Sequence, residues 1–115
     1  VYASNIFGPE SDKFGLANVS WLSGTSAWMY LAATQYILGI RATWEGLMID
    51  PCVPADWKSF RASRVFRGVR YDITFSNPNG KNHGVASISV DGQSISGNII
   101  PPITDRKSVN VHVTL

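Results

Sequence analysis

Apolar and polar positions follow one period in the first part of the chain and a different period in the second. From Thr25 to Gly39 the apolar residues recur at helical spacing with few polar interruptions, so this stretch predicts a helix. Ser23 or Thr25 is suited to cap its first turn, and Gly39 is suited to end it. Because an isolated surface helix has a wider polar face, we expect this helix to pack among other helices.

Residues 1–22 predict no helical partner for it. Gly8-Pro9 and Gly15 interrupt this stretch, and its scattered polar positions indicate a loop. The predicted helix therefore lacks partners within the chain.

From about Gly46 onward, apolar and polar positions alternate with a period of two. The alternation predicts strands, most clearly at 69–75, 86–90 and 109–115, with shorter ones at 47–49, 60–66 and 95–99. Asp91-Gly92 predicts a tight hairpin, and residues 77–84 supply a longer turn. About six antiparallel strands with one solvated face indicate a β-sandwich or jelly roll.

Composition narrows the class of protein. A hydrophobic fraction of 44% with 16% charged residues is typical of a folded chain. The net charge of +2 and the lack of a Lys/Arg run argue against nucleic acid, and the apolar stretch at 27–40 is too short to span a membrane. The single Cys52 excludes an internal disulfide and fits a reducing compartment, so we expect a cytoplasmic protein. No spacing typical of a metal or nucleotide site occurs, and we expect neither a metal nor a cofactor.

Six ordered sequence blocks resemble one known family. They read "VYAS" at 1–4, "SWLSGTSAW" at 20–28, "YILGIR" at 36–41, "GLMIDPCVPADW" at 46–57, "FRG" at 66–68 and "SVDGQSISGNIIP" at 89–101. Together they resemble the C-terminal end of the cellobiose/chitobiose phosphorylase family, glycoside hydrolase family 94.

This resemblance implies an α+β fragment with two parts. Residues 1–45 would be the final loop and helix of an (α/α)6 catalytic barrel, and residues 46–115 an antiparallel, jelly-roll-like β-sandwich domain. The missing helical partners would then belong to the upstream part of the same enzyme. Relatives of this kind are commonly homodimers, so a homodimer is expected here too.

The resemblance also implies a reaction. Family members cleave a β-linked disaccharide with inorganic phosphate, the co-substrate, and invert the anomeric centre to release an α-sugar 1-phosphate. One carboxylic acid protonates the leaving oxygen, as in inverting hydrolases, while phosphate attacks from the opposite face. The family's acid, an Asp, and a phosphate-contacting His would lie upstream, so no catalytic residue is expected in this segment. His83 and His112 are expected to be solvated and do not replace that His.

The candidate phosphate site is Ser23, Gly24 and Thr25. A Thr-Gly pair contacts phosphate in the family, and its matching positions here are Ser23 and Gly24, where serine keeps the hydroxyl. A glycine lets the backbone approach an anion, and the start of the helix near Thr25 adds a favourable dipole. The same hydroxyl groups are also ordinary helix caps, and the two interpretations are compatible.

The candidate sugar-binding residues are Tyr2, Ser4 and Asn5. They match a loop that contacts sugar in relatives, many of which carry Gln at the position of Ser4. Serine at this position lacks the Gln side-chain amide, which both donates and accepts hydrogen bonds. Sugar preference is therefore expected to differ from that of such relatives, with Asn5 taking over part of the role. The alternative is an ordinary polar loop.

Two other functions remain open at this point. One is a non-catalytic β-sandwich carbohydrate-binding module. Trp44 and Trp57 could form its stacking platform, or they could bury the junction between the two parts of the chain. The other is the C-terminal part of a cyclic β-1,2-glucan synthase, whose corresponding region is related to this family.

Overall fold

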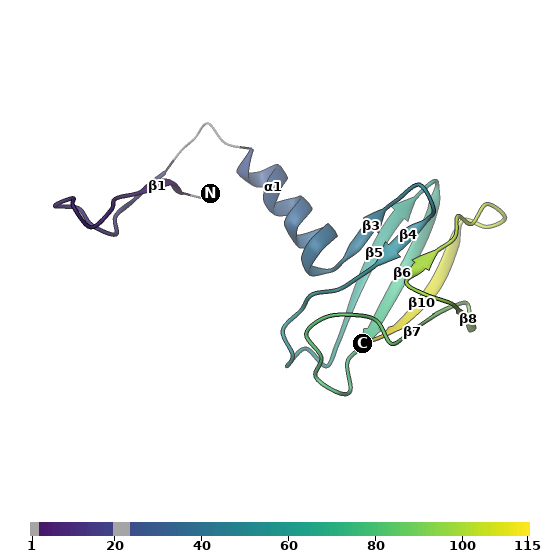
Figure 1. Cartoon of the computed structure of the whole chain (residues 1–115). Helices are drawn as coiled ribbons and strands as arrows, with labels where there is room; N and C mark the ends of the chain where they lie inside the picture. Colours follow the sequence, from purple (N-terminus) through teal and green to yellow (C-terminus); the bar gives the residue numbers. More distant parts are fainter. Residues whose placement is uncertain (1–2, 20–23) are drawn as a thin grey trace. The chain divides into compact units, whose positions relative to one another are not determined.

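The computed structural model describes residues 3–19 and 24–115 (Figure 1). The chain divides into two compact units, residues 1–32 and residues 33–115. The boundary expected at residue 45, between a barrel segment and a β-domain, refers to the domains of a longer enzyme. It stays a prediction.

The first unit begins with a small two-stranded antiparallel sheet. Strand β1, Ala3–Ile6, pairs with β2, Ala17–Val19, with a shift in register between Ala3 and Asn5. The turn between them is closed by hydrogen bonds from Phe7 N–H to the Leu16 carbonyl and from Gly15 N–H to the Phe7 carbonyl, both 3.0 Å long. The expectation of a plain loop over 1–22 is therefore wrong, because backbone pairing rather than an alternating pattern makes these short strands.

The predicted helix is present. It consists of α1, Thr25–Leu31, followed directly by the π-helical segment η1, Ala32–Ile37. In the wider segment, Leu38 N–H donates to the Ala33 carbonyl at 2.9 Å, an i to i−5 bond. Gly39, at a φ of 67°, ends the segment, as the sequence predicts.

The cap at the start of the helix differs from the prediction. Gly24 occupies the N-cap position, where glycine has no side chain to accept a hydrogen bond, and Thr25 is the first helical residue. Thr25 as N-cap is therefore wrong, because its backbone is already helical. Ser23 lies outside the described residues.

Residues 33–115 form two sheets (Figure 1). The larger has the order β5-β6-β10-β7-β8, and the smaller has the order β3-β4-β9. The larger sheet comprises β5 Ser59–Phe66, β6 Val69–Ser76, β7 Ser87–Val90, β8 Gln93–Ile95 and β10 Ser108–Thr114. The smaller sheet comprises β3 Ile40–Ala42, β4 Leu47–Ile49 and β9 Ile99–Ile100.

Both sheets contribute to one hydrophobic core. Alternate residues of the long strands point inward, where each large apolar side chain contributes about 1.5–3 kcal/mol when buried. The smaller sheet supplies Ile40, Leu47, Ile49 and Ile100, and the larger supplies Phe66, Val69, Tyr71, Ile73, Phe75, Ile88, Val109, Val111 and Val113. The second unit is thus a mostly β-sheet body with the core expected of a sandwich.

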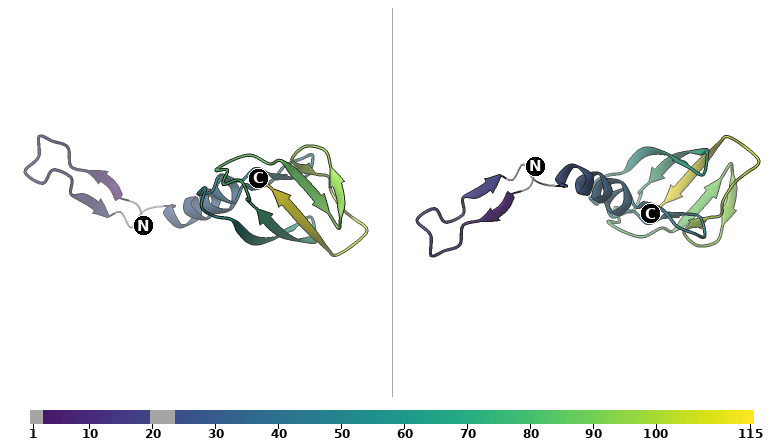
Figure 2. Two further views of the ribbon diagram at one scale, coloured as in Figure 1. Left: turned by 90° about the horizontal axis from the view of Figure 1, so that it is seen from below. Right: turned by 90° about the horizontal axis from the view of Figure 1, so that it is seen from above.

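Two details of the strand prediction are wrong. β10 pairs in parallel with β6, although only antiparallel pairs were expected, and Figure 2 shows β10 between β6 and β7. The predicted strand at 95–99 is interrupted, because Gly97 at a φ of 77° separates β8 from β9. Strand β3 was not predicted, although the equally short β4 was predicted at 47–49 and is present.

The two predicted turns are present. Asp91 and Gly92 have φ values of 47° and 85°, the left-handed pair of a type I′ hairpin turn, and Val90 pairs with Gln93. In the longer turn, the buried side chain of Asn77 donates to the Lys81 carbonyl at 2.7 Å and accepts from Lys81 N–H at 2.8 Å.

Candidate functional site

The described part of the candidate phosphate site is the start of α1. Gly24 has φ −71° and ψ 17°, values open to any residue, so backbone conformation does not require glycine there. Its carbonyl accepts the Trp28 N–H at 2.8 Å, and a Cβ on Gly24 would lie 3.2 Å from Trp28 Cδ1. The first turn carries no acidic side chain that would repel an anion, and Thr25 is buried.

The candidate sugar-binding residues lie on or next to β1. Tyr2, like Ser23, lies outside the described residues. Ser4 and Asn5 belong to the strand itself, where Asn5 is exposed and pairs across the sheet with Asn18. The structure thus places Asn5 on a strand and Gly24 with Thr25 at a helix start, and it leaves their proposed roles untested.

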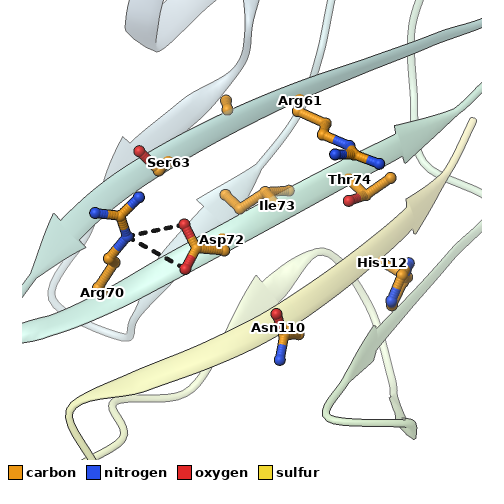
Figure 3. Close-up of a pocket in the computed structure, with 9 residues that line it drawn as sticks. Arg61, Ser63, Arg70, Asp72, Ile73, Thr74, Asn110 and His112 are labelled. Carbon is orange, nitrogen blue, oxygen red and sulfur yellow. Dashed lines mark hydrogen bonds and ion pairs between the residues drawn. The ribbon is translucent and has the colours of Figure 1, made fainter.

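A second group of polar side chains, which the sequence analysis did not assemble, lines a hollow of about 590 Å³ on the larger sheet (Figure 3). Register aligns these side chains in two neighbouring cross-strand rows on β5, β6 and β10. The cationic row consists of Arg61, Thr74 and His112. The hydroxyl-binding row consists of Ser63, Asp72 and Asn110.

Charge is distributed unevenly in this hollow. Arg70 Nε donates to both carboxylate oxygens of Asp72, at 2.9 and 3.2 Å, so these two charges compensate each other. Neither the Arg61 side chain nor the His112 side chain makes a hydrogen bond or ion pair with any residue among 3–19 and 24–115. His112 is exposed, as the sequence predicts. Strand register brings these residues together. The apolar and polar pattern of one strand does not show which residues of another strand lie beside it.

A smaller hollow of about 440 Å³ lies where η1 meets the β-strands of its own unit. Arg41 donates to Asp50 at 2.8 Å, and its guanidinium carbon lies 5.5 Å from the centre of the Tyr36 ring. Cys52 is exposed and pairs with His83 through an isolated β-bridge. Asp50, directly after β4, thus carries an ion pair.

The two tryptophans considered above have different surroundings. Trp44, in the turn between β3 and β4, is 94% exposed, and its carbonyl accepts a hydrogen bond from Arg67 at 3.1 Å. Trp57 packs edge-on against Phe60 with ring centres 5.5 Å apart. Trp44 is therefore on the surface of the 33–115 unit, and its place at a junction stays a prediction.

Residues 3–19 and 24–115 contain no cluster of three or more His, Cys, Asp or Glu side chains arranged to hold a metal ion. In the same residues, no helix has the length and apolar character needed to cross a membrane.

Comparison with known proteins decides the family. The model of the glycosyl hydrolase 94 superfamily catalytic domain matches residues 1–39. An N,N'-diacetylchitobiose phosphorylase of Vibrio proteolyticus is 44% identical over 87% of this chain, and one of Vibrio furnissii is 41% identical over 96%. The chain belongs to glycoside hydrolase family 94. A solabiose phosphorylase of Paenibacillus borealis is 33% identical over 99% of the chain.

The chain spans 12%, 14% and 15% of the lengths of these three relatives, in the order given. All six candidate site residues, Tyr2, Ser4, Asn5, Ser23, Gly24 and Thr25, lie within the range matched by the family model. The match assigns the range to the family and leaves the role of each residue to be tested.

Proposed function

We propose that the chain is part of an inverting β-disaccharide phosphorylase of family 94. The observation that carries the proposal is that the relatives named above, similar over most of this chain, are all phosphorylases of small saccharides. We expect the preference of the whole enzyme, whether for cellobiose, chitobiose or a cellobionate-type substrate, to depend mostly on upstream residues.

In the proposed reaction, a carboxylic acid outside this chain donates a proton to the glycosidic oxygen. A phosphate oxygen attacks the anomeric carbon from the opposite face as the carbon–oxygen bond breaks, which gives an α-sugar 1-phosphate and a free sugar. Phosphate is already a competent nucleophile, so the protein has to hold and orient it rather than deprotonate it.

The proposed role of this chain is to supply one wall of the phosphate site. Ser23 and Thr25 would donate hydroxyl groups, and Gly24 would let the backbone approach the anion. The first backbone N–H groups of a helix lack intrahelical acceptors and carry a partial positive charge, which favours an oxyanion. The absence of acidic side chains in the first turn of α1 supports this role.

The surface of the helical segment supports a place inside a larger enzyme. Trp28 and Tyr30 on α1 are 71% and 68% exposed, and Tyr36 on η1 is also exposed. Large apolar surfaces of this kind are typical of a buried interface. We infer that upstream helices of the same enzyme cover them, and that the enzyme is a homodimer.

The phosphate site is tested by substituting Gly24 in the whole enzyme. Gly24→Val places a branched side chain against Trp28 and into the space proposed for the anion, so the apparent constant for phosphate should rise about tenfold, which corresponds to one lost charge-assisted hydrogen bond. Gly8→Val is the matched control, because a Cβ at Gly8 meets nothing within 4 Å. An unchanged phosphate dependence in Gly24→Val would overturn this role.

The proposed sugar contacts of Tyr2, Ser4 and Asn5 are tested separately. Ser4→Gln restores a side chain with both a donor and an acceptor, so it should shift the preference among acceptor sugars. An unaltered specificity profile would contradict the contact.

One observation favours the carbohydrate-binding alternative. The exposed indole of Trp44 could stack on a sugar ring without phosphate. Glycan binding that is independent of phosphate and lost in Trp44→Ala would support that alternative. The cyclic β-1,2-glucan synthase alternative is weaker, since the relatives reported above are phosphorylases.

A further inference from the structure

We propose that the hollow on β5, β6 and β10 is a second ligand site, which binds a sugar carrying one anionic group, a phosphate or a carboxylate. The cationic row would hold the oxyanion, and the hydroxyl-binding row would hold the ring hydroxyl groups. The inference goes beyond the proposed phosphorylase function, because it uses only residues of the 33–115 unit and none of the candidate catalytic-site residues.

Register places the cationic row on one line across the sheet. Thr74 on β6 is the direct neighbour of Arg61 on β5 and of His112 on β10. Figure 3 shows the Arg61 side chain extending along the face towards Thr74, with His112 on the neighbouring strand. Strands are about 4.8 Å apart, so a guanidinium, a hydroxyl and an imidazole can reach one small ligand.

No acidic side chain in the hollow neutralises the positive charge of Arg61 in the cationic row. The carboxylate in the hollow, Asp72, is already bonded to Arg70, whereas Arg61 has no ion pair with any described residue. A guanidinium binds carboxylate and phosphate oxygens in two parallel hydrogen bonds. The row therefore favours an oxyanion over a neutral ligand.

The hydroxyl-binding row has a different character. Asp72 accepts hydrogen bonds, Asn110 both donates and accepts, and the Ser63 hydroxyl can do either. This mixture of donors and acceptors fits the hydroxyl groups of a sugar ring. It does not fit a bare anion, which offers acceptors alone.

The spacing of the two rows matches the size of such a ligand. Corresponding residues are two positions apart along each strand, for example Asp72 and Thr74, so the rows lie about 7 Å apart. A hexose ring with one charged substituent spans a similar length. The hollow of about 590 Å³ has room for it.

The lining also argues against other ligands. Its residues include no aromatic ring besides the His112 imidazole, so the stacking surface that neutral glycans use is missing. One uncompensated guanidinium is too little for the repeated phosphates of a nucleic acid.

Calorimetric titration of the whole chain tests the proposal. The probes are α-D-glucose 1-phosphate, D-glucuronate, inorganic phosphate and cellobiose, each at low salt. Either or both of the anionic sugars should bind at least tenfold more tightly than cellobiose, which lacks the charge, and than inorganic phosphate, which lacks the ring. Equal affinity for cellobiose, equal affinity for inorganic phosphate, or no binding of either anionic sugar would overturn the proposal.

Variants then assign the site. Arg61→Gln should weaken binding of the anionic sugar about tenfold, whereas Lys107→Ala, which removes an equal charge outside the hollow, should leave it unchanged. Asn110→Ala should weaken binding of the anionic sugar but not the residual binding of inorganic phosphate. Each substituted side chain is exposed, and circular dichroism checks that the fold is retained.

The outcome separates this site from the candidate phosphate site. Binding of glucose 1-phosphate that is lost in Gly24→Val and unaffected by Arg61→Gln would place the ligand at the helix start and overturn the second site. If Arg61→Gln loses binding of glucose 1-phosphate while the whole enzyme keeps normal phosphorolysis, the result would support the second site independently of the candidate phosphate site.

Discussion

The backbone N–H of Asp50 donates a hydrogen bond of 2.8 Å to the carbonyl of Gly39. This bond joins the residue that ends the helical segment to the residue that follows β4. At the same point Cys52 N–H donates to the Ile37 carbonyl at 2.9 Å. Backbone hydrogen bonds therefore connect the end of the helical segment to the segment that follows β4. These bonds require the two backbones to lie close together.

Gly39→Ala should destabilise this junction by about 2 kcal/mol or more. Its φ of 67° costs an L-residue about 1–2 kcal/mol, and an added Cβ would collide with the Asp50 carbonyl group. Gly68→Ala is the matched control, because Gly68 has a φ of 83° but open space around it. Urea unfolding should show a clearly larger loss for Gly39→Ala. Equal losses in the two variants would mean that close approach to Asp50 has no energetic effect.

Asp91 should contribute stability that depends on pH. Its Oδ1 accepts the Asn110 N–H and its Oδ2 accepts from Arg106, both at 2.9 Å. The Asn110 bond first, and the Arg106 guanidinium next, hold the pKa of Asp91 below its ordinary value. The stabilisation is therefore complete above that ordinary value, about 4, and is lost as the pH falls through the lower folded-state pKa.

Asp91→Asn isolates this contribution, because asparagine tolerates the φ of 47° and keeps one acceptor oxygen. The variant should melt at a lower temperature than the parent at pH 7, and the difference should shrink between pH 5 and pH 2. Asp56→Asn serves as control, since Asp56 has no ion pair or hydrogen bond among the described residues. A gap that stays constant with pH would contradict the proposed linkage.

Asn77→Ala should cost about 2–3 kcal/mol. The side chain is fully buried and bonds both backbone polar groups of Lys81, so its loss removes two part-buried hydrogen bonds. Asn79→Ala, at an exposed position of the same turn, should change the free energy of unfolding by less than about 0.5 kcal/mol. Chemical denaturation of both variants provides the measurement. Similar small effects would show that the turn does not depend on Asn77.

Tyr71→Phe should leave stability at neutral pH within about 1 kcal/mol of the parent or raise it. The phenol is fully buried, and its hydroxyl makes no hydrogen bond of acceptable geometry with the described residues. Burial raises the pKa of Tyr71, and the Ile103 backbone and the Arg67 charge oppose the shift. The stability due to the neutral phenol is thus complete below pH 10 and is lost as the pH rises through the folded-state pKa.

Melting curves of this variant between pH 7 and pH 11 test both parts of the prediction. Above pH 10 the parent should lose stability faster than Tyr71→Phe. Phe75→Leu controls for repacking, because it changes core volume without removing a titratable group. A large loss in Tyr71→Phe at pH 7 would show that the hydroxyl has a strong partner after all.

Much of the secondary structure follows from local pattern. The alternation in 69–75 and 109–115 places one set of residues in the core and the other on the surface, and the structure shows this for β6 and β10. Asp91-Gly92 and Gly39 were predictable because left-handed backbone favours these residue types. Strand β3 and the hairpin of β1 with β2 were not, since these short stretches show no clear pattern of their own and form through backbone pairing.

The candidate sites divide in the same way. The sequence blocks alone indicated the family and the stretch that holds Ser23, Gly24 and Thr25, because those motifs are continuous in the chain. Only tertiary structure could bring Arg61 beside Thr74 and His112, since a parallel pairing of β6 with β10 and its register decide which surface residues become neighbours. Local pattern determines which side of a strand is polar, whereas the pairing of distant strands determines what that polar side can bind.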